Sequence, residues 1–128
     1  MFYSDFYNYK RTGTSITGIT YRDIKYGPVP TYYDSIFAFL EGNYFLISDF
    51  IDDGRGSARE IFKSEIIPNE ELFTEEELTT INKIIKKFKD TPTWDMVDMS
   101  HKEEAWKKFN SENEVISYQD YAFDINDL

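Results

Sequence analysis

The chain has 128 residues, with 24 acidic against 14 basic side chains and a formal charge of −10. This length fits a single domain spanning residues 1–128, and the negative charge argues against direct binding of nucleic acid, whose affinity depends on Lys and Arg that neutralise phosphates. Cysteine is absent, which excludes disulfides and thiolate metal sites. No apolar run reaches the roughly 18 residues of a membrane span, and the start lacks a signal-peptide pattern. We therefore expect a cytoplasmic protein.

The first predicted element is a helix that begins at residue 2. Its signal is a set of aromatic residues at helical spacing: Phe2, Tyr3, Phe6 and Tyr7. Gly13, just past two cations, is typical of a helix end. Because the pattern starts without a capping residue, we expect that something, such as an upstream helix, preceded it: either the chain is a short version or its beginning is missing. Unless such a helix, a partner or a second copy covers them, Phe2 and Phe6 should form an exposed apolar patch.

A strand and a proline-rich corner follow. The β-branched and aromatic residues of Ile19–Lys25 favour a strand. Pro28 and Pro30 fix φ at about −65° and push the residues before them toward extended conformations. Gly27–Pro30 can therefore be neither a helix nor a central strand. We expect a rigid corner that displays the Tyr26 side chain and steers the chain into the next helix.

A helix and a hairpin are predicted after the corner. Thr31 can cap the helix, and its apolar face contains Tyr33, Ile36, Phe37 and Leu40. Residues 44–51 and 58–67 are apolar segments separated by the turn-forming residues Asp52–Gly56, which predicts an antiparallel hairpin. We expect this hairpin to pair with the strand around Tyr21.

The clearest helix is Glu75–Lys89. Thr74 and Glu77 have the spacing of a capping box. The predicted core stripe consists of Leu78, Ile81, Ile84, Ile85 and Phe88. Acidic residues at the start and lysines toward the end suit the helix dipole, so the lysine run is interpreted as structural.

Two further helices are predicted between residues 91 and 110. Pro92 opens the first, which carries Trp94. Ser100 and Glu103 have capping-box spacing and would open the second, which carries Trp106. Both tryptophans fall on apolar helical faces and are predicted to lie in the core.

The tail from residue 111 onward is acidic but keeps apolar residues. It could dock through a short helix capped by Ser117, with Asp124–Leu128 fraying. The predicted fold is α+β and mostly α, with four to five helices packed on a small antiparallel sheet of about three strands.

Three motifs occur in a characteristic order. Residues 11–18 read RTGTSITG, residues 26–30 read YGPVP and residues 100–106 read SHKEEAW. In this order they resemble the Panacea domain of SocA-like antitoxins, which occurs on phages and other mobile elements. The resemblance spans most of the chain and implies a protein toxin as partner, encoded by an adjacent gene. Related domains usually carry another apolar helix upstream, and no catalytic residues define the family.

No catalytic, cofactor or metal site is predicted. His101 is the only histidine, and its place after Ser100 favours a structural role, either bonded to a backbone carbonyl or left in solvent. A calcium loop was weighed at Asp49, Asp52 and Asp53, but the spacing of ligands is wrong. Residues 54–56 are too short for a phosphate-binding loop. We therefore expect that folding needs neither metal nor nucleotide.

Partner binding is predicted around the corner. A preorganised loop loses little entropy on binding, and rigid aromatic residues are favoured anchors. The candidate residues are Tyr26, Gly27, Pro28, Pro30, Tyr32, Tyr33 and His101. The corner has an equally good structural explanation, and the acidic surface can serve either attraction to a basic partner or solubility.

Three functions remain open from the sequence. The first is an antitoxin that neutralises a toxin by direct contact, either as a monomer or as a homodimer. The second is an adaptor that presents its partner to a protease, with the acidic tail as the presented or presenting segment. The third is an enzyme that uses His101 with acidic neighbours.

Overall fold

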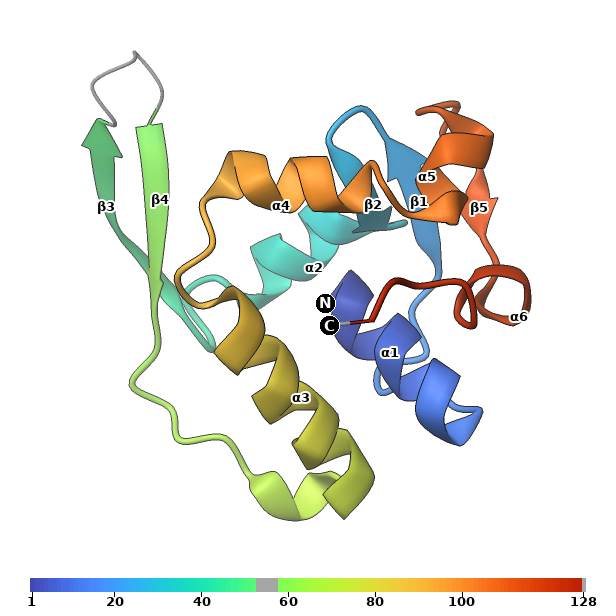
Figure 1. The fold of residues 1–128 in the computed structure, drawn as a ribbon. Helices are drawn as coiled ribbons and strands as arrows, with labels where there is room; N and C mark the ends of the chain where they lie inside the picture. The colour runs from blue at the N-terminus through green and yellow to red at the C-terminus, as the bar shows by residue number, and fades with distance from the viewer. Residues whose placement is uncertain (53–57, 128) are drawn as a thin grey trace. The chain divides into compact units, whose positions relative to one another are not determined.

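The computed structural model describes the backbone of residues 1–52 and 58–127, and the side chains of residues 1–45 and 62–127. The chain forms two compact units, a larger one of Met1–Thr31 with Glu71–Leu128 and a smaller one of Tyr32–Glu70. Each unit is considered by itself, and the single domain expected from length stays a prediction. Figure 1 shows the elements.

The described residues form six α-helices, four of them longer than seven residues, and five strands. The α+β, mostly α, fold class is therefore confirmed. In chain order the elements are α1 (Phe2–Thr12), β1 (Tyr21–Ile24), β2 (Gly27–Pro30), α2 (Tyr33–Leu40), β3 (Leu46–Asp52), β4 (Ala58–Lys63), a 3₁₀ helix (Glu70–Leu72), α3 (Glu75–Phe88), α4 (Thr93–Ser100), α5 (Glu104–Phe109), β5 (Val115–Ile116) and α6 (Tyr118–Tyr121).

The larger unit contains a three-stranded antiparallel sheet in the order β2-β1-β5. A two-residue turn joins β1 to β2, and Tyr26 is its second residue. The predicted corner at Gly27–Pro30 is thus an edge strand. Proline has no N–H to donate to a ladder, and an edge strand has one side on which no ladder bond is required.

The pairing predicted for the hairpin is wrong. β3 and β4 do form an antiparallel hairpin, with Leu46 opposite Lys63, but they make a separate two-stranded sheet. Both edges of β1 are already occupied, by β2 on one side and by β5 on the other. Tyr21 in β1 is opposite Ile116 in β5, a strand of two residues that carries no alternation to reveal it. The turn predicted within residues 52–56 lies almost entirely outside the described residues.

The core of the larger unit is built on the aromatic face of α1. Phe2 is 7% exposed and Phe6 is fully buried, so the expected apolar patch at these residues is wrong. The Phe6 ring lies 5.8 Å from the ring of Tyr21 in β1 and 4.5 Å from that of Tyr118 in α6. The central strand β1 and the C-terminal helix α6 therefore bury the Phe6 ring.

Local signals at the helix ends are confirmed in part. α1 ends at Gly13, which has a left-handed φ of 79°. Thr74 and Glu77 form the predicted capping box of α3, and Ser117 caps α6. Thr31 does not cap α2, because its hydroxyl donates instead to the carbonyl of Thr20, at 3.0 Å.

The stripe of α3 differs from the predicted one at two positions. Ile85 is 56% exposed, whereas Thr80 is fully buried. The Thr80 hydroxyl donates to the side-chain oxygen of Asn8 at 3.0 Å and accepts from the guanidinium of Arg11 at 2.9 Å. The contact between α1 and α3 is therefore partly polar, which an apolar periodicity cannot predict.

The predicted capping box at Ser100 and Glu103 is wrong. Ser100 is the last residue of α4, and its hydroxyl donates to the carbonyl of Val97. The Glu103 carboxylate is 3% exposed and accepts from the Tyr3 hydroxyl at 3.1 Å. It also accepts from the backbone and side-chain amides of Asn126, both at 3.0 Å. Glu103, which the local spacing predicts to be part of a helix cap, is therefore engaged in hydrogen bonds to residues far away in the sequence.

The fraying predicted for Asp124–Leu128 is also wrong for the described part of this segment. Ile125 is 3% exposed, and its carbonyl accepts from the Lys10 ammonium at 2.8 Å. Together with the bonds of Asn126 to Glu103, this contact fixes the tail to the larger unit.

A buried carboxylate organises the segment between α1 and β1. Asp5 has no exposed surface. Its Oδ1 accepts from the backbone N–H groups of Ile16 and Thr17, at 2.9 and 2.8 Å. Its Oδ2 accepts from the hydroxyls of Thr17 and Tyr21, both at 2.6 Å. Burial and the Asp5 carboxylate raise the pKa of the Tyr21 hydroxyl well above its ordinary value, so this hydroxyl stays a donor.

Replacing Asp5 with alanine should strongly destabilise the protein. The change removes four hydrogen bonds and leaves the buried Tyr21 hydroxyl and two backbone N–H groups without their acceptor, which should cost about 3 kcal/mol or more. We expect the melting temperature to fall by roughly 10 °C in thermal unfolding followed by circular dichroism. Asp98→Ala, at an exposed position of α4, is the control and should shift stability by less than about 0.5 kcal/mol. Equal melting of the two variants would contradict the role given to Asp5.

Candidate partner-binding surface

The seven residues predicted to bind a partner are divided between the two units. Tyr26, Gly27, Pro28, Pro30 and His101 belong to the larger unit, and Tyr32 and Tyr33 to the smaller one. The fixed prolines between them also predict that Tyr26 and Tyr32 lie near one another; because each unit is considered by itself, this stays a prediction. Both of these side chains are more than half exposed, whereas Gly27 and Pro30 are buried. The glycine and prolines thus shape the strand rather than offering side chains to a partner.

An exposed aromatic surface surrounds the β1–β2 turn. Tyr26 is 56% exposed and Trp94, on α4, is 61% exposed, with their ring centroids 6.2 Å apart in an edge-to-face arrangement. The Lys25 ammonium lies 5.2 Å from the centre of the Tyr26 ring. His101 and Trp106 stack with their centroids 3.7 Å apart. We call these five residues the aromatic turn surface.

Side chains of the SHKEEAW motif hold the backbone of the turn. The His101 Nε2 lies 3.1 Å from the carbonyl oxygen of Lys25, one of the two structural roles expected for this histidine. The indole N–H of Trp106 donates to the carbonyl of Ile24 at 3.4 Å. Since β1 ends at Ile24, both bonds support the residues that position Tyr26.

The YGPVP and SHKEEAW motifs also meet where the backbone of Gly27 lies close to the side chain of Ser100. Gly27 has a φ of 118°, and a Cβ at this position would lie 2.5 Å from the Oγ of Ser100. Glycine is therefore required both by the backbone conformation and by the space. Figure 1 shows α4 running beside β2, the strand that Gly27 begins. The YGPVP and SHKEEAW segments thus fold as one supporting structure for the turn.

Trp94 was predicted to lie in the core, and this is wrong. Trp94 lies in the first turn of α4, directly after the N-cap residue Pro92. Asp98 follows Trp94 by four residues and is exposed, so the two share a face of the helix. The charged Asp98 four residues after Trp94 could have indicated from the sequence that this face of α4 is exposed to solvent. Trp106 is half-buried, in part because it stacks on His101.

Asp23 lies in β1 beneath this surface and has no exposed area. Its Oδ2 accepts from the backbone N–H of Ser111, whereas its Oδ1 has no hydrogen-bond partner among the described residues. Burial raises the pKa of the Asp23 carboxyl, and the Ser111 bond and the electrostatic influence of His101 oppose this rise. Asp23 is thus an acidic neighbour of His101, but one that no substrate in solvent can contact.

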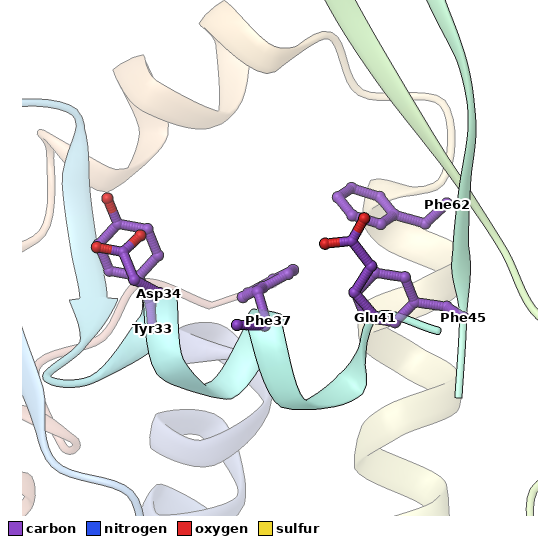
Figure 2. A pocket seen from close by; sticks show the side chains of 7 residues that line it. Tyr33, Asp34, Phe37, Glu41, Phe45 and Phe62 are labelled. Carbon is purple, nitrogen blue, oxygen red and sulfur yellow. The ribbon is translucent and has the colours of Figure 1, made fainter. Parts of the chain in front are cut away.

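The smaller unit contains an open pocket of about 520 Å³ along one face of α2. Figure 2 shows its lining side chains. They are Tyr33, Asp34, Phe37, Ala38, Glu41, Phe45 and Phe62. Tyr33 is thus the one predicted site residue among them. The other six were not predicted as site residues, although the helical spacing of the α2 members was visible in the sequence.

No metal-binding group of three His, Asp or Glu residues is found among the side chains that the structure describes. The weighed calcium loop at Asp49, Asp52 and Asp53 and the Gly54–Gly56 segment fall outside those side chains. In the described ranges no helix is both long enough and apolar enough to cross a membrane.

A family model described as "Antitoxin SocA-like, Panacea domain" matches residues 1–107. The chain belongs to this family. No curated protein and no solved structure matches it. Panacea membership indicates an antitoxin role, implies a toxin as partner in general terms and suggests a non-enzymatic role. The matched range includes all three motifs and every residue of the aromatic turn surface, so this surface is built from the Panacea portion of the chain.

Replacing Gly27 with alanine should destabilise the protein for two reasons, the positive φ of this residue and the overlap of the new Cβ with Ser100. A control variant separates the two costs. Gly18→Ala is the matched control, because Gly18 also has a positive φ, of 69°, but has nothing within 4 Å of a built Cβ. The control should cost about 1–2 kcal/mol. Gly27→Ala should cost about 3 kcal/mol or more, because overlap with Ser100 adds roughly 1–3 kcal/mol. Equal costs, measured by urea unfolding, would show that the contact with Ser100 is unimportant.

Asp23→Asn should change how stability depends on pH. Because the folded state raises the pKa of Asp23 above its unfolded value of 3.8, the folded state binds the proton more tightly. This group therefore lowers stability as the pH rises from the unfolded pKa through the folded one. Asparagine cannot ionise, so the variant should gain stability relative to the parent as the pH rises above the unfolded pKa of Asp23, measured by urea unfolding at several pH values. Asp98→Asn should show no such trend, and a difference for Asp23→Asn that is independent of pH would refute this account.

Proposed function

We propose that this Panacea domain is an antitoxin that neutralises a cognate protein toxin by direct contact. In this proposal the toxin is encoded by an adjacent gene of a phage or other mobile element and is bound in the cytoplasm. The antitoxin covers the toxin's active or target-binding surface and carries out no catalysis of its own. The family match over residues 1–107 is the observation that carries the proposal.

The aromatic turn surface is the part of the larger unit best suited to this contact. Tyr26 and Trp94 offer large exposed rings, and Tyr and Trp are enriched among the residues that dominate binding energy. The bonds of His101 and Trp106 to the turn carbonyls hold the backbone in place before binding. A surface ordered in advance loses less entropy when the partner binds.

The adaptor alternative loses the feature that motivated it. It used a loose acidic tail as the presented or presenting segment, but the described tail is fixed by Ile125, which is buried, and by Asn126, which bonds to Glu103. The enzymatic alternative relied on His101 with acidic neighbours. Its Nε2 is engaged with a backbone carbonyl, and the neighbouring Asp23 is fully buried. Both observations favour the antitoxin proposal.

Tyr26→Ala and Trp94→Ala should weaken neutralisation without lowering stability. Truncation of an aromatic anchor at an interface commonly costs about 2 kcal/mol, or roughly thirtyfold in affinity. We expect loss of protection when each variant is co-expressed with the toxin gene, and a higher Kd in titration with purified toxin. Tyr32→Ala should be measured beside them, because Tyr32 is 75% exposed in the smaller unit.

The control for this experiment is Ile84→Ala on α3. Ile84 packs against the core of the larger unit, so its truncation should lower the melting temperature, at a cost of about 2 kcal/mol. A loss of protection in this variant would report stability rather than contact. If the Tyr26 and Trp94 variants keep both their melting point and full protection, the aromatic turn surface is only a structural feature.

A further inference from the structure

The pocket of the smaller unit combines aromatic walls with two carboxylates. Asp34 and Glu41 are seven residues apart on α2 and its end, and Phe37 lies between them. This spacing places all three on one face of the helix. Figure 2 shows Asp34 beside Tyr33 at one end of the pocket, Phe37 in the middle and Glu41 at the other end.

A cluster of phenylalanine rings forms the wall beside Glu41. Phe45 and Phe62 meet edge to face with their centroids 5.1 Å apart. The ring of Phe37 lies 6.0 Å from that of Phe45 and 5.9 Å from that of Phe62. These rings pack on one another, yet Phe37 remains 37% exposed and Phe62 remains 48% exposed. They therefore offer ring surface to a bound side chain.

The carboxylates of the pocket have no cationic partner among the side chains that the structure describes. Neither the Asp34 nor the Glu41 carboxylate forms an ion pair or accepts a hydrogen bond in the described part of the structure. α2 also has no buried residue. A helix that folds for stability alone buries its apolar face, so the exposed rings of this face are available for contact with something else.

The chemistry of the lining selects a cation that has an apolar stem. An aliphatic stem can lie against the phenylalanine rings, and a cationic head group can pair with a carboxylate. An anion would be repelled, and a neutral apolar side chain would desolvate the carboxylates without compensation. Arginine fits best, because its planar guanidinium both stacks on aromatic rings and bonds carboxylate oxygens in pairs.

We propose that this pocket binds a basic segment of the toxin through arginine side chains. The inference rests on the proposed function, and it names the chemistry of the partner surface. Seven residues of helix span about 10 Å, so Asp34 and Glu41 each receive their own cation, and the stem of one of them crosses Phe37. The charge of −10 on the whole chain attracts a basic surface over a longer range and speeds encounter with it.

The first experiment tests the pocket without the toxin. N-acetylarginine amide is titrated into the whole protein, and the signals of Phe37, Phe45 and Phe62 are followed by NMR, with N-acetylnorleucine amide as the neutral probe. Saturable shifts with the arginine probe alone are expected. The double variant Asp34→Asn with Glu41→Gln should bind the arginine probe at least tenfold more weakly. No saturable shift at these rings, or equal shifts with the neutral probe, would overturn the proposal whether or not the protein is an antitoxin.

The matched control removes two charges elsewhere. Glu112 and Glu114 are exposed residues of the larger unit, and the double variant Glu112→Gln with Glu114→Gln has the same net charge as the pocket variant. This control should bind the arginine probe like the parent protein. An equal loss in the two variants would mean that only net charge matters, which would overturn the proposal of a defined pocket.

The second experiment uses the toxin. The pocket variant should raise the Kd for the toxin at least tenfold, whereas the charge-matched control should raise it much less. If the pocket binds the arginine probe but its variant still neutralises the toxin fully, the occupant is not the toxin and this proposal fails, while the antitoxin function stands. If neither the parent nor any variant binds the toxin, the proposed function fails first, and the probe titration still reports on the pocket.

Discussion

The larger unit depends on one buried carboxylate. Asp5 accepts two backbone N–H groups from the segment that follows α1 and two hydroxyls, one of which belongs to Tyr21 at the start of β1. This single side chain therefore sets the path by which the chain leaves the first helix and enters the central strand. Because β2 and β5 both pair with β1, the position of the whole sheet follows from it. The motif at residues 11–18 is thus shaped by an acceptor outside the motif.

Other polar groups fasten the remaining segments in the same way. Glu103 ties α1 to the tail through Tyr3 and Asn126, and Thr80 ties α3 to α1 through Asn8. Glu103 and Thr80 are both buried and bonded, so removing a partner would leave part of their hydrogen-bonding capacity without compensation. Hydrogen bonds require a particular donor and acceptor, so such bonds specify which segments of this aromatic core meet.

The features predicted correctly from the sequence are those whose partners are near in the chain. The stop at Gly13 and the capping box of Thr74 with Glu77 each depend on residues within one turn. The errors occurred where a distant partner competes. Glu103 has the spacing of a cap but bonds to a residue one hundred positions away, and β5 is too short to show alternation. The display of Tyr26 at the corner was predictable, and this side chain is exposed. Trp94 is exposed as well, against the prediction, because the apolar character of its helical face counts for less than the charge of Asp98 on the same face.

The two candidate surfaces differ in what supports them. Behind the turn that displays Tyr26 lie the bonds of His101 and Trp106 and the close contact of Gly27 with Ser100, so substitutions among these supporting residues affect folding and binding together. The pocket of the smaller unit lies on α2, a helix without a buried residue. Exposed side chains contribute little to stability, so changes at Asp34 or Glu41 can alter the preferred partner at little structural cost. If the pocket binds the toxin as proposed, partner preference would thus depend on residues that contribute little to the stability of the smaller unit.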